Sequence, residues 1–90
     1  MAKAIIDPAE VRRFAADLRR FTDGMHEQMN ALVSRHRSLG QTWRDQEHTK
    51  FSDEFEHSMR SLGRFREQVT EHVPFLLRKA QRADDYLNQQ

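Results

Sequence analysis

The residues of this chain that are able to do chemistry are five histidines and several serines, and they are scattered along the sequence. Glu54-x-x-His57 has the spacing at which a carboxylate and an imidazole on one helix face bind iron in helical bundles. Such a site also needs inward carboxylates from the other helices, and no second Glu-x-x-His is present. We therefore interpret the pair as a solvated helix face and expect no metal or other cofactor.

No serine has the setting of an activated nucleophile. The serines lie near histidines in sequence, but none stands at a strand-to-helix elbow, and no glycine-rich loop is present to hold a phosphate. An enzyme is therefore not expected. His36 falls on the apolar stripe described below, and it is interpreted as a satisfied polar core residue that helps to set register. A pH-sensitive interface is the alternative for His36.

Length and composition narrow the class of protein. The chain has 90 residues, so one domain over residues 1–90 is expected; 37% of the residues are hydrophobic, 32% are charged and none is cysteine. This excludes disulfide scaffolds and cysteine zinc modules, and no apolar run is long enough to span a membrane. The net charge of +1 does not favour nucleic acid as a partner.

The first helix is predicted from a start signal and an apolar stripe. Asp7 can cap the helix, Pro8 suits its first turn and Glu10 stands at the capping-box position. The stripe recurs in steps of three and four with one stutter near Gly24, which we expect to allow close packing. It consists of Val11, Phe14, Leu18, Phe21, Met25, Met29, Leu32, His36, Leu39 and Trp43.

A turn and a second helix follow. Gly40 is expected to end the first helix in a left-handed conformation, and Asp45 to cap the second. Pro74 predicts a kink, or a break, in the second helix. The second stripe, again in threes and fours, consists of Phe51, Phe55, Met59, Leu62, Phe65, Val69, Val73, Leu76, Ala80, Ala83 and Leu87.

The predicted fold class is all-α: two long antiparallel helices, about 8–40 and 46–87, joined by a turn at 41–45 in a helix-turn-helix hairpin. A two-helix seam is too narrow to bury both stripes, and Phe65, Phe75 and Leu77 lie off its best line. We therefore expect two hairpins to dimerise into a four-helix bundle. The interface is expected to contain Phe14, Leu18, Phe21, Met25, Leu32, Phe55, Met59, Leu62, Val69 and Leu76.

Trp43, the only tryptophan, lies in the predicted turn. Physical chemistry alone leaves two interpretations open, a hydrophobic plug that closes the hairpin and an exposed recognition anchor.

These features together resemble the WXG-type family, the early secreted antigen-like substrates of type VII secretion systems. The resemblance covers nearly the whole chain: the opening Asp7 through Leu18, the turn approach Leu39-Gly40-x-x-Trp43, the spacing from Trp43 to Phe51, and the ending Leu76 through Tyr86. Two positions depart from the family pattern. The turn reads Trp-x-Asp, with Asp45 where the family has glycine, and Gln90 takes the acid position of the Tyr-x-x-x-Asp/Glu export signal that begins at Tyr86.

The resemblance implies a non-enzymatic protein that is a secreted substrate or targeting partner of a type VII-like system. Its implied partners are a second copy, or another small helical WXG-type protein, and a secretion ATPase. Export by this non-classical route is expected, or a cytoplasmic location if the signal ending at Gln90 does not function. A cytoplasmic helical adaptor or chaperone-like module is the alternative function. A membrane-active effector that uses Arg12-Arg13 and Arg19-Arg20 comes third.

Overall fold

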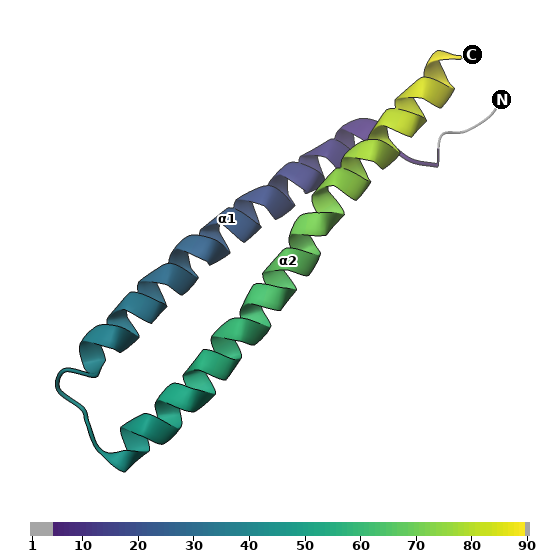
Figure 1. The fold of residues 1–90 in the computed structure, drawn as a ribbon. Coiled ribbons are helices and arrows are strands. Elements are labelled where there is room, and N and C mark those ends of the chain that lie inside the picture. The colour runs from purple at the N-terminus through teal and green to yellow at the C-terminus, as the bar shows by residue number, and fades with distance from the viewer. Residues whose placement is uncertain (1–4, 90) are drawn as a thin grey trace.

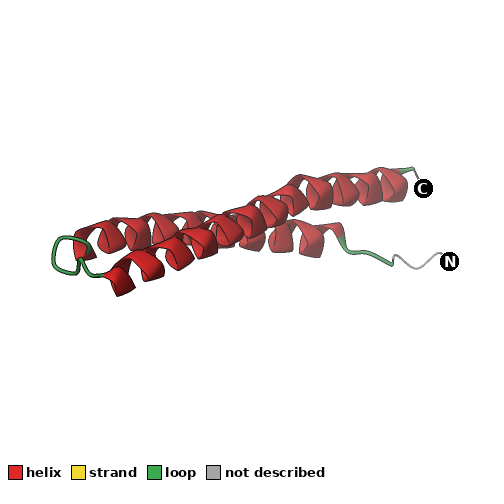
Figure 2. Ribbon diagram, turned by 60° about the horizontal axis from the view of Figure 1, so that its bottom comes forward, coloured by secondary structure: helices red, strands yellow, loops and turns green. Residues whose placement is uncertain are grey.

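The computed structural model describes residues 5–89 and consists of two long helices in a hairpin, α1 (Pro8–Leu39) and α2 (Gln46–Asn88) (Figure 1). The helices run side by side in opposite directions and cross at a shallow angle, with both chain ends at the end opposite the turn (Figure 2). The Cα trace measures 70 × 16 × 15 Å. The predicted all-α hairpin is confirmed.

Both helices begin at aspartate caps. The Asp7 carboxylate accepts a hydrogen bond from the Ala9 amide at 3.0 Å, and Pro8 occupies the first turn. The Asp45 carboxylate accepts from the His48 amide, also at 3.0 Å. Each cap satisfies an amide that has no partner within its helix. Glu10 forms an ion pair with Arg13 one turn along the helix.

The end of α1 differs from the sequence prediction. Gly40 has φ −63° and ψ −13°, which is right-handed, so the predicted left-handed termination is wrong. The last carbonyls of α1 are instead satisfied by successive backbone bonds: the amide of Gly40 donates to His36, that of Gln41 to Ser38, and that of Trp43 to Leu39, at 3.0–3.2 Å. The glycine therefore has another role, described with the site below.

Pro74 lies inside α2, which continues through it without a break from Gln46 to Asn88. Because proline has no amide hydrogen, the carbonyl of Thr70 loses its usual helical donor. The hydroxyl of Thr70 donates to the carbonyl of Arg66 at 2.8 Å, so this turn of the helix also carries a side-chain hydrogen bond. Of the two predicted outcomes, the break is excluded.

The seam between the helices follows a different line from the predicted stripe. Ala15 and Thr22 are buried in α1, with 1% and 3% of their surface exposed, whereas Phe14 and Phe21 are 55% and 52% exposed. The burial pattern fits an unbroken heptad without the expected stutter. Its positions, all buried or half-buried except the exposed Leu32 and Leu62, are Val11, Ala15, Leu18, Thr22, Met25, Met29, Leu32 and His36 in α1, and Ser52, Phe55, Met59, Leu62, Arg66, Val69, Val73, Leu76, Ala80 and Ala83 in α2.

Small residues fill this seam in the half of the hairpin that holds the chain ends. Ala15 and Ala80 are almost completely buried, at 1% and 0% exposed. Helices that meet through alanine approach closely, so a phenylalanine ring does not fit between them. This explains why Phe14 and Phe21 lie outside the seam.

Gly24 does not have the role that the sequence predicted for it. It lies within α1, so it makes no turn, but a Cβ built there would meet nothing within 4 Å. The expected close packing at Gly24 is therefore absent from the hairpin.

The two flanks of the seam differ in character. One flank is polar: Arg12 forms an ion pair with Asp84 across the helices at 2.5 Å. On the other flank, helical geometry places the aromatic residues that precede seam positions. We name this second flank the phenylalanine face; it consists of Phe14, Phe21, Phe51, Phe65 and Tyr86, all of which are exposed.

Candidate functional site

Five aromatic and imidazole rings gather where α1 meets the turn and α2 begins. The rings of Trp43 and His48 lie edge to face with centroids 5.0 Å apart, and the rings of His48 and His36 stack at 5.6 Å. His36 also lies 4.6 Å from Phe55, and Phe51 lies about equally far, 6.0–6.1 Å, from His36, Phe55 and Trp43. We name this group the turn cluster: His36, Trp43, His48, Phe51 and Phe55.

A hydrogen-bonded chain runs through the turn cluster. His36 Nε2 lies 2.9 Å from the hydroxyl oxygen of Ser52, and the same oxygen lies 3.4 Å from Nε2 of His48. His36 is on α1 and the other two residues are on α2, so the chain crosses the seam. All three side chains are half-buried. His36 is thus a hydrogen-bonded seam residue, as the sequence indicated.

Gly40 makes room for this arrangement. A Cβ on Gly40 would lie 3.4 Å from Cε1 of His48 and 3.3 Å from the carbonyl oxygen of Arg37. The lack of a side chain therefore allows the His48 ring to lie against the end of α1. Space, and not a left-handed backbone, is what this position requires.

Trp43 and Asp45 of the turn motif act on each other as well as on α2. The pKa of the Asp45 carboxyl is held below its ordinary value of 3.8, first by the hydrogen bond from the His48 amide and also by the Trp43 side chain. Trp43 is half-buried against His48 and Phe51, so it does cover the hairpin end. Asp45 therefore caps α2 through the His48 amide and also interacts with the side chain of Trp43 in the turn.

His48 and Ser52 are the site residues that the sequence interpretation missed. The predicted second stripe begins at Phe51, one residue before Ser52, so it does not include Ser52 or His48. Extending the heptad back from Val69 and Val73 through Phe55 reaches Ser52 and then His48. Their position in the same heptad as Val69 and Val73 is the feature of the sequence that indicates Ser52 and His48 as seam residues.

The residues predicted for a dimer interface divide between the seam and the outer surface. Val69 is 9% exposed and has little surface left to offer a second chain. Half-buried members of the set are Leu18, Met25, Phe55, Met59 and Leu76. The exposed members are Phe14, Phe21, Leu32 and Leu62.

The predicted export-signal residues lie at the opposite end of the hairpin from the turn. Tyr86 is in the last turns of α2, and 56% of its surface is exposed. Gln90 lies outside the described residues. Trp43 and Tyr86 of one chain are therefore at opposite ends of a 70 Å rod.

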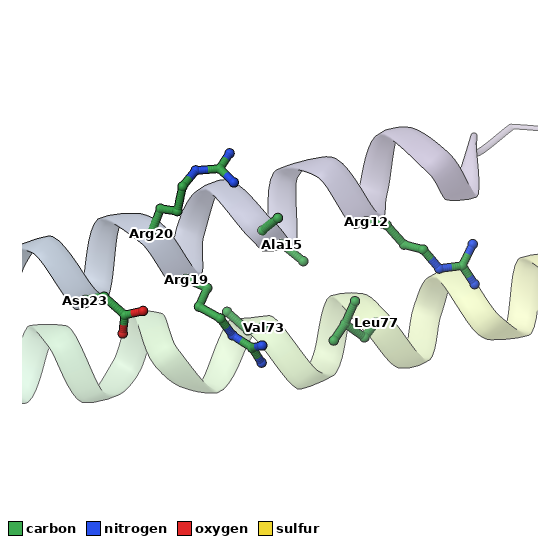
Figure 3. Close-up of a pocket in the computed structure, with 8 residues that line it drawn as sticks. Arg12, Ala15, Arg19, Arg20, Asp23, Val73 and Leu77 are labelled. Carbon is green, nitrogen blue, oxygen red and sulfur yellow. The ribbon is translucent and has the colours of Figure 1, made fainter.

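The polar flank carries two shallow depressions, of about 270 and 250 Å³, which share Arg19, Asp23 and Val73. Figure 3 shows the larger one, with Arg19 reaching toward Val73 of α2 while Arg20 extends away from α2. Arg20 pairs with Asp17 on its own helix. The depressions are thus lined by arginines mixed with an aspartate above a small apolar floor.

Within residues 5–89, no three histidine, aspartate or glutamate side chains lie close enough together to hold a metal ion, and His57 and Glu54 gain no third ligand. Neither helix has, in the part of the chain that the structure describes, a stretch that is long and apolar enough to cross a bilayer.

Comparison with known proteins gives one result that bears on identity. Neither the curated proteins nor the solved structures include a match to this chain. The model of the WXG100 family, described as proteins of 100 residues with WXG, matches residues 4–85. That match spans α1, the Trp43 turn and α2 as far as Asp85, and the hairpin has the architecture that the resemblance implied. The chain belongs to the WXG100 family.

Proposed function

We propose that this protein is an export substrate, or a targeting partner, of a type VII-like secretion system and works as a dimer joined through the phenylalanine face. The WXG100 family is associated with small helical secretion substrates that typically form dimers and are not enzymes. The finer role, the dimer of this chain and its export are our proposal. Of these, the dimer is supported by the distribution of apolar surface.

The observation that carries the proposal is the contrast between a thin core and an apolar exterior. Among the described residues, the buried hydrophobic ones are Ala15, Val69, Val73 and Ala80, whereas thirteen large hydrophobic residues are exposed. Burying apolar surface contributes roughly 25 cal/mol per Å², so an aromatic face left in water is costly. A second hairpin laid on this face supplies the missing partner surface.

Charges along the phenylalanine face favour a second copy of this chain as the partner. On α1 the flanking charges run from acidic near the chain ends (Glu10, Asp17) to basic near the turn (Arg35). On α2 they run from acidic near the turn to basic near the chain ends; these residues are Glu47, Glu54, Lys79 and Arg82. Two copies related by a two-fold axis in the plane of the interface place opposite charges against each other, whether the turns lie together or apart.

The dimer is tested by solution mass from light scattering for the wild type and two variants. Phe21→Lys places a charge on the phenylalanine face and is expected to convert the dimer to a monomer. Val33→Lys is the matched control, since Val33 is 37% exposed but lies on the polar flank. If the wild type is a monomer by itself and dimerises only with another WXG-type protein, the partner is that protein and not a second copy of this chain. A Phe21→Lys variant that stays dimeric would disprove the interface.

For export, we propose that Trp43 of one chain and Tyr86 of its neighbour form a composite recognition surface at one end of an antiparallel bundle. Trp43→Ala is expected to abolish export, or binding to a secretion ATPase, while leaving helix content nearly intact. Secretion of the tagged protein from a host that carries the secretion system measures this. Persistent export and partner binding in Trp43→Ala would contradict the composite surface.

The cytoplasmic adaptor remains a second candidate because of Gln90. The export signal implied by the resemblance ends in an acid, and Gln90 is a neutral amide. If the protein is exported on its own signal, Gln90→Glu should increase its export. If neither the wild type nor the Gln90→Glu variant is exported, and both bind a larger helical protein, the result supports the adaptor role instead.

A further inference from the structure

The chain His36–Ser52–His48 makes two imidazoles share one hydroxyl. Nε2 of each ring faces the same oxygen, at 2.9 Å for His36 and 3.4 Å for His48. A serine hydroxyl has one proton, so it can donate to only one ring and must accept from the N–H of the other. In the neutral chain, one ring therefore carries its proton on Nε2 and the other on Nδ1.

We infer that these three residues form a proton-operated latch that holds the turn end of the hairpin closed while at most one imidazole is charged and releases it when both are charged. The first added proton breaks neither hydrogen bond of the chain. The ring that donates to Ser52 can gain a proton on Nδ1, and both hydrogen bonds of the chain persist. The crossing between α1 and α2 stays intact.

The second proton changes the chain. The ring that accepted from Ser52 becomes a donor, so the hydroxyl oxygen accepts from both rings and must turn its own proton elsewhere. Two positive charges then face each other on stacked rings with centroids 5.6 Å apart and an interplanar angle of 21°. Like charges at that separation repel more strongly in a half-buried site than in water.

The surroundings act on the rings in two ways. The coulombic interaction with His48 is among the causes that lower the pKa of the Asp45 carboxyl, so this carboxylate favours the charged form of His48, and the repulsion from a charged His36 opposes it. The aromatic walls are Phe55, 4.6 Å from His36, and Trp43, 5.0 Å from His48, and they limit solvation of the ring faces. The charged side chains between residues 35 and 56 are all exposed; they are Arg35 and Arg37 on α1, Arg44 and Asp45 in the turn, and Glu47, Lys50, Asp53, Glu54 and Glu56 on α2.

The latch controls how the turn presents Trp43. The tryptophan ring rests on His48, and His48 lies against Gly40 at the end of α1. Release of the rings therefore frees Trp43 and the first turn of α2 together. Histidine is the side chain that gains a proton on mild acidification, so acid is the signal that releases the latch. This inference concerns a single hairpin and does not depend on the proposed dimer or on export.

The test is amide hydrogen exchange of the full chain between about pH 8 and pH 5, corrected for the intrinsic pH dependence of exchange, with Trp43 fluorescence recorded in parallel. Residues 37–52 are expected to exchange about tenfold faster at the acid end, while residues 69–80 keep their protection. The Trp43 emission should change over the same interval. His48→Gln keeps a polar side chain next to Ser52 but cannot be charged, so the acid response should disappear.

His57→Gln is the matched control, since His57 is exposed on α2 outside the turn cluster, and it should respond like the wild type. A normal acid response in His48→Gln, or acceleration spread evenly over both helices, would overturn the latch. If His48→Gln loses its helix content, Ser52→Ala gives the answer. Without the hydroxyl, turn-end exchange at neutral pH should approach the acid rate of the wild type, and unchanged protection would disprove the latch. Solution mass of the same samples separates dimer dissociation from opening of the turn.

Discussion

Arg66 of α2 donates a hydrogen bond from Nε to the backbone carbonyl of Thr22 in α1 at 2.8 Å, across the middle of the hairpin. Arg66 occupies a seam position, and its guanidinium serves as a cross-helix donor where most seam residues are apolar. Thr22 is buried and donates its own hydroxyl to the carbonyl of Arg19. The pair fixes how the two helices are aligned along their length.

Removing this contact should weaken the hairpin. Arg66→Ala deletes a hydrogen bond from a charged donor, so the free energy of unfolding is expected to fall by about 1.5–3 kcal/mol. Urea unfolding followed by circular dichroism measures the change. Arg64→Ala is the control, because Arg64 is exposed and its guanidinium donates a hydrogen bond to Ser61 on its own helix. Equal stability of the two variants would show that Arg66 does not set the alignment.

The small residues of the seam predict that the same substitution at two adjacent alanines, Ala15 and Ala16, changes the free energy of unfolding by very different amounts. Ala15 is 1% exposed between the helices, whereas Ala16 is exposed. Ala15→Leu overfills the seam and should destabilise the hairpin by about 1–3 kcal/mol, while Ala16→Leu should change stability by less than about 0.5 kcal/mol. Thermal unfolding of the two variants makes the comparison. A seam through Phe14 and Phe21 would instead make Ala15→Leu harmless.

Gly24 and Gly63 form a second matched pair. Both lie within helices, and a Cβ at either would meet nothing within 4 Å, so each Gly→Ala change should stabilise the hairpin by about 0.5–1 kcal/mol. Gly24 lies at the edge of the phenylalanine face, while Gly63 lies on the polar flank. Gly24→Ala alone should then weaken self-association, as measured by sedimentation. Equal dimer affinity for both variants would place the second chain away from Gly24.

The lowered pKa of Asp45 predicts how the stability of the hairpin depends on pH. Its pKa is lowered in the folded chain from the ordinary value of 3.8, so its stabilising effect is complete above that value and disappears as the pH falls through the folded pKa. Asp45→Asn keeps a capping side chain but cannot titrate. The variant should lose less helix than the wild type below about pH 3.8 when followed by circular dichroism. Asp53→Asn, a change at an exposed position past the first turn of α2, should behave as the wild type does.

The sequence was sufficient to predict the hairpin and its turn. The caps at Asp7 and Asp45, and the recurrence of apolar residues in threes and fours, depend on local chemistry that a single chain carries in full. The outward position of Phe65 and Phe75 also followed from the pattern, and they are 46% and 56% exposed.

The line of the seam could not be predicted in the same way. Phe14 next to Ala15, and Phe21 next to Thr22, are pairs in which the larger residue is the more hydrophobic. The distance between the helices, which periodicity does not contain, decides which of them fits inside. For the same reason the sequence pattern favours Phe51 over its neighbour Ser52 as a seam residue. The role of Gly40 also depends on tertiary packing, because the His48 ring lies where a Gly40 side chain would be.

The seam of small residues has an evolutionary consequence. The buried residues of the seam are Ala15, Thr22, Val69, Val73 and Ala80, while Phe14, Phe21 and Phe65 of the phenylalanine face lie outside it. Mutations can therefore alter the outer aromatic residues, and with them the choice of partner, at little cost to the hairpin itself. Gene duplication followed by change on that face alone would turn a self-pairing chain into a matched pair of chains that share one fold.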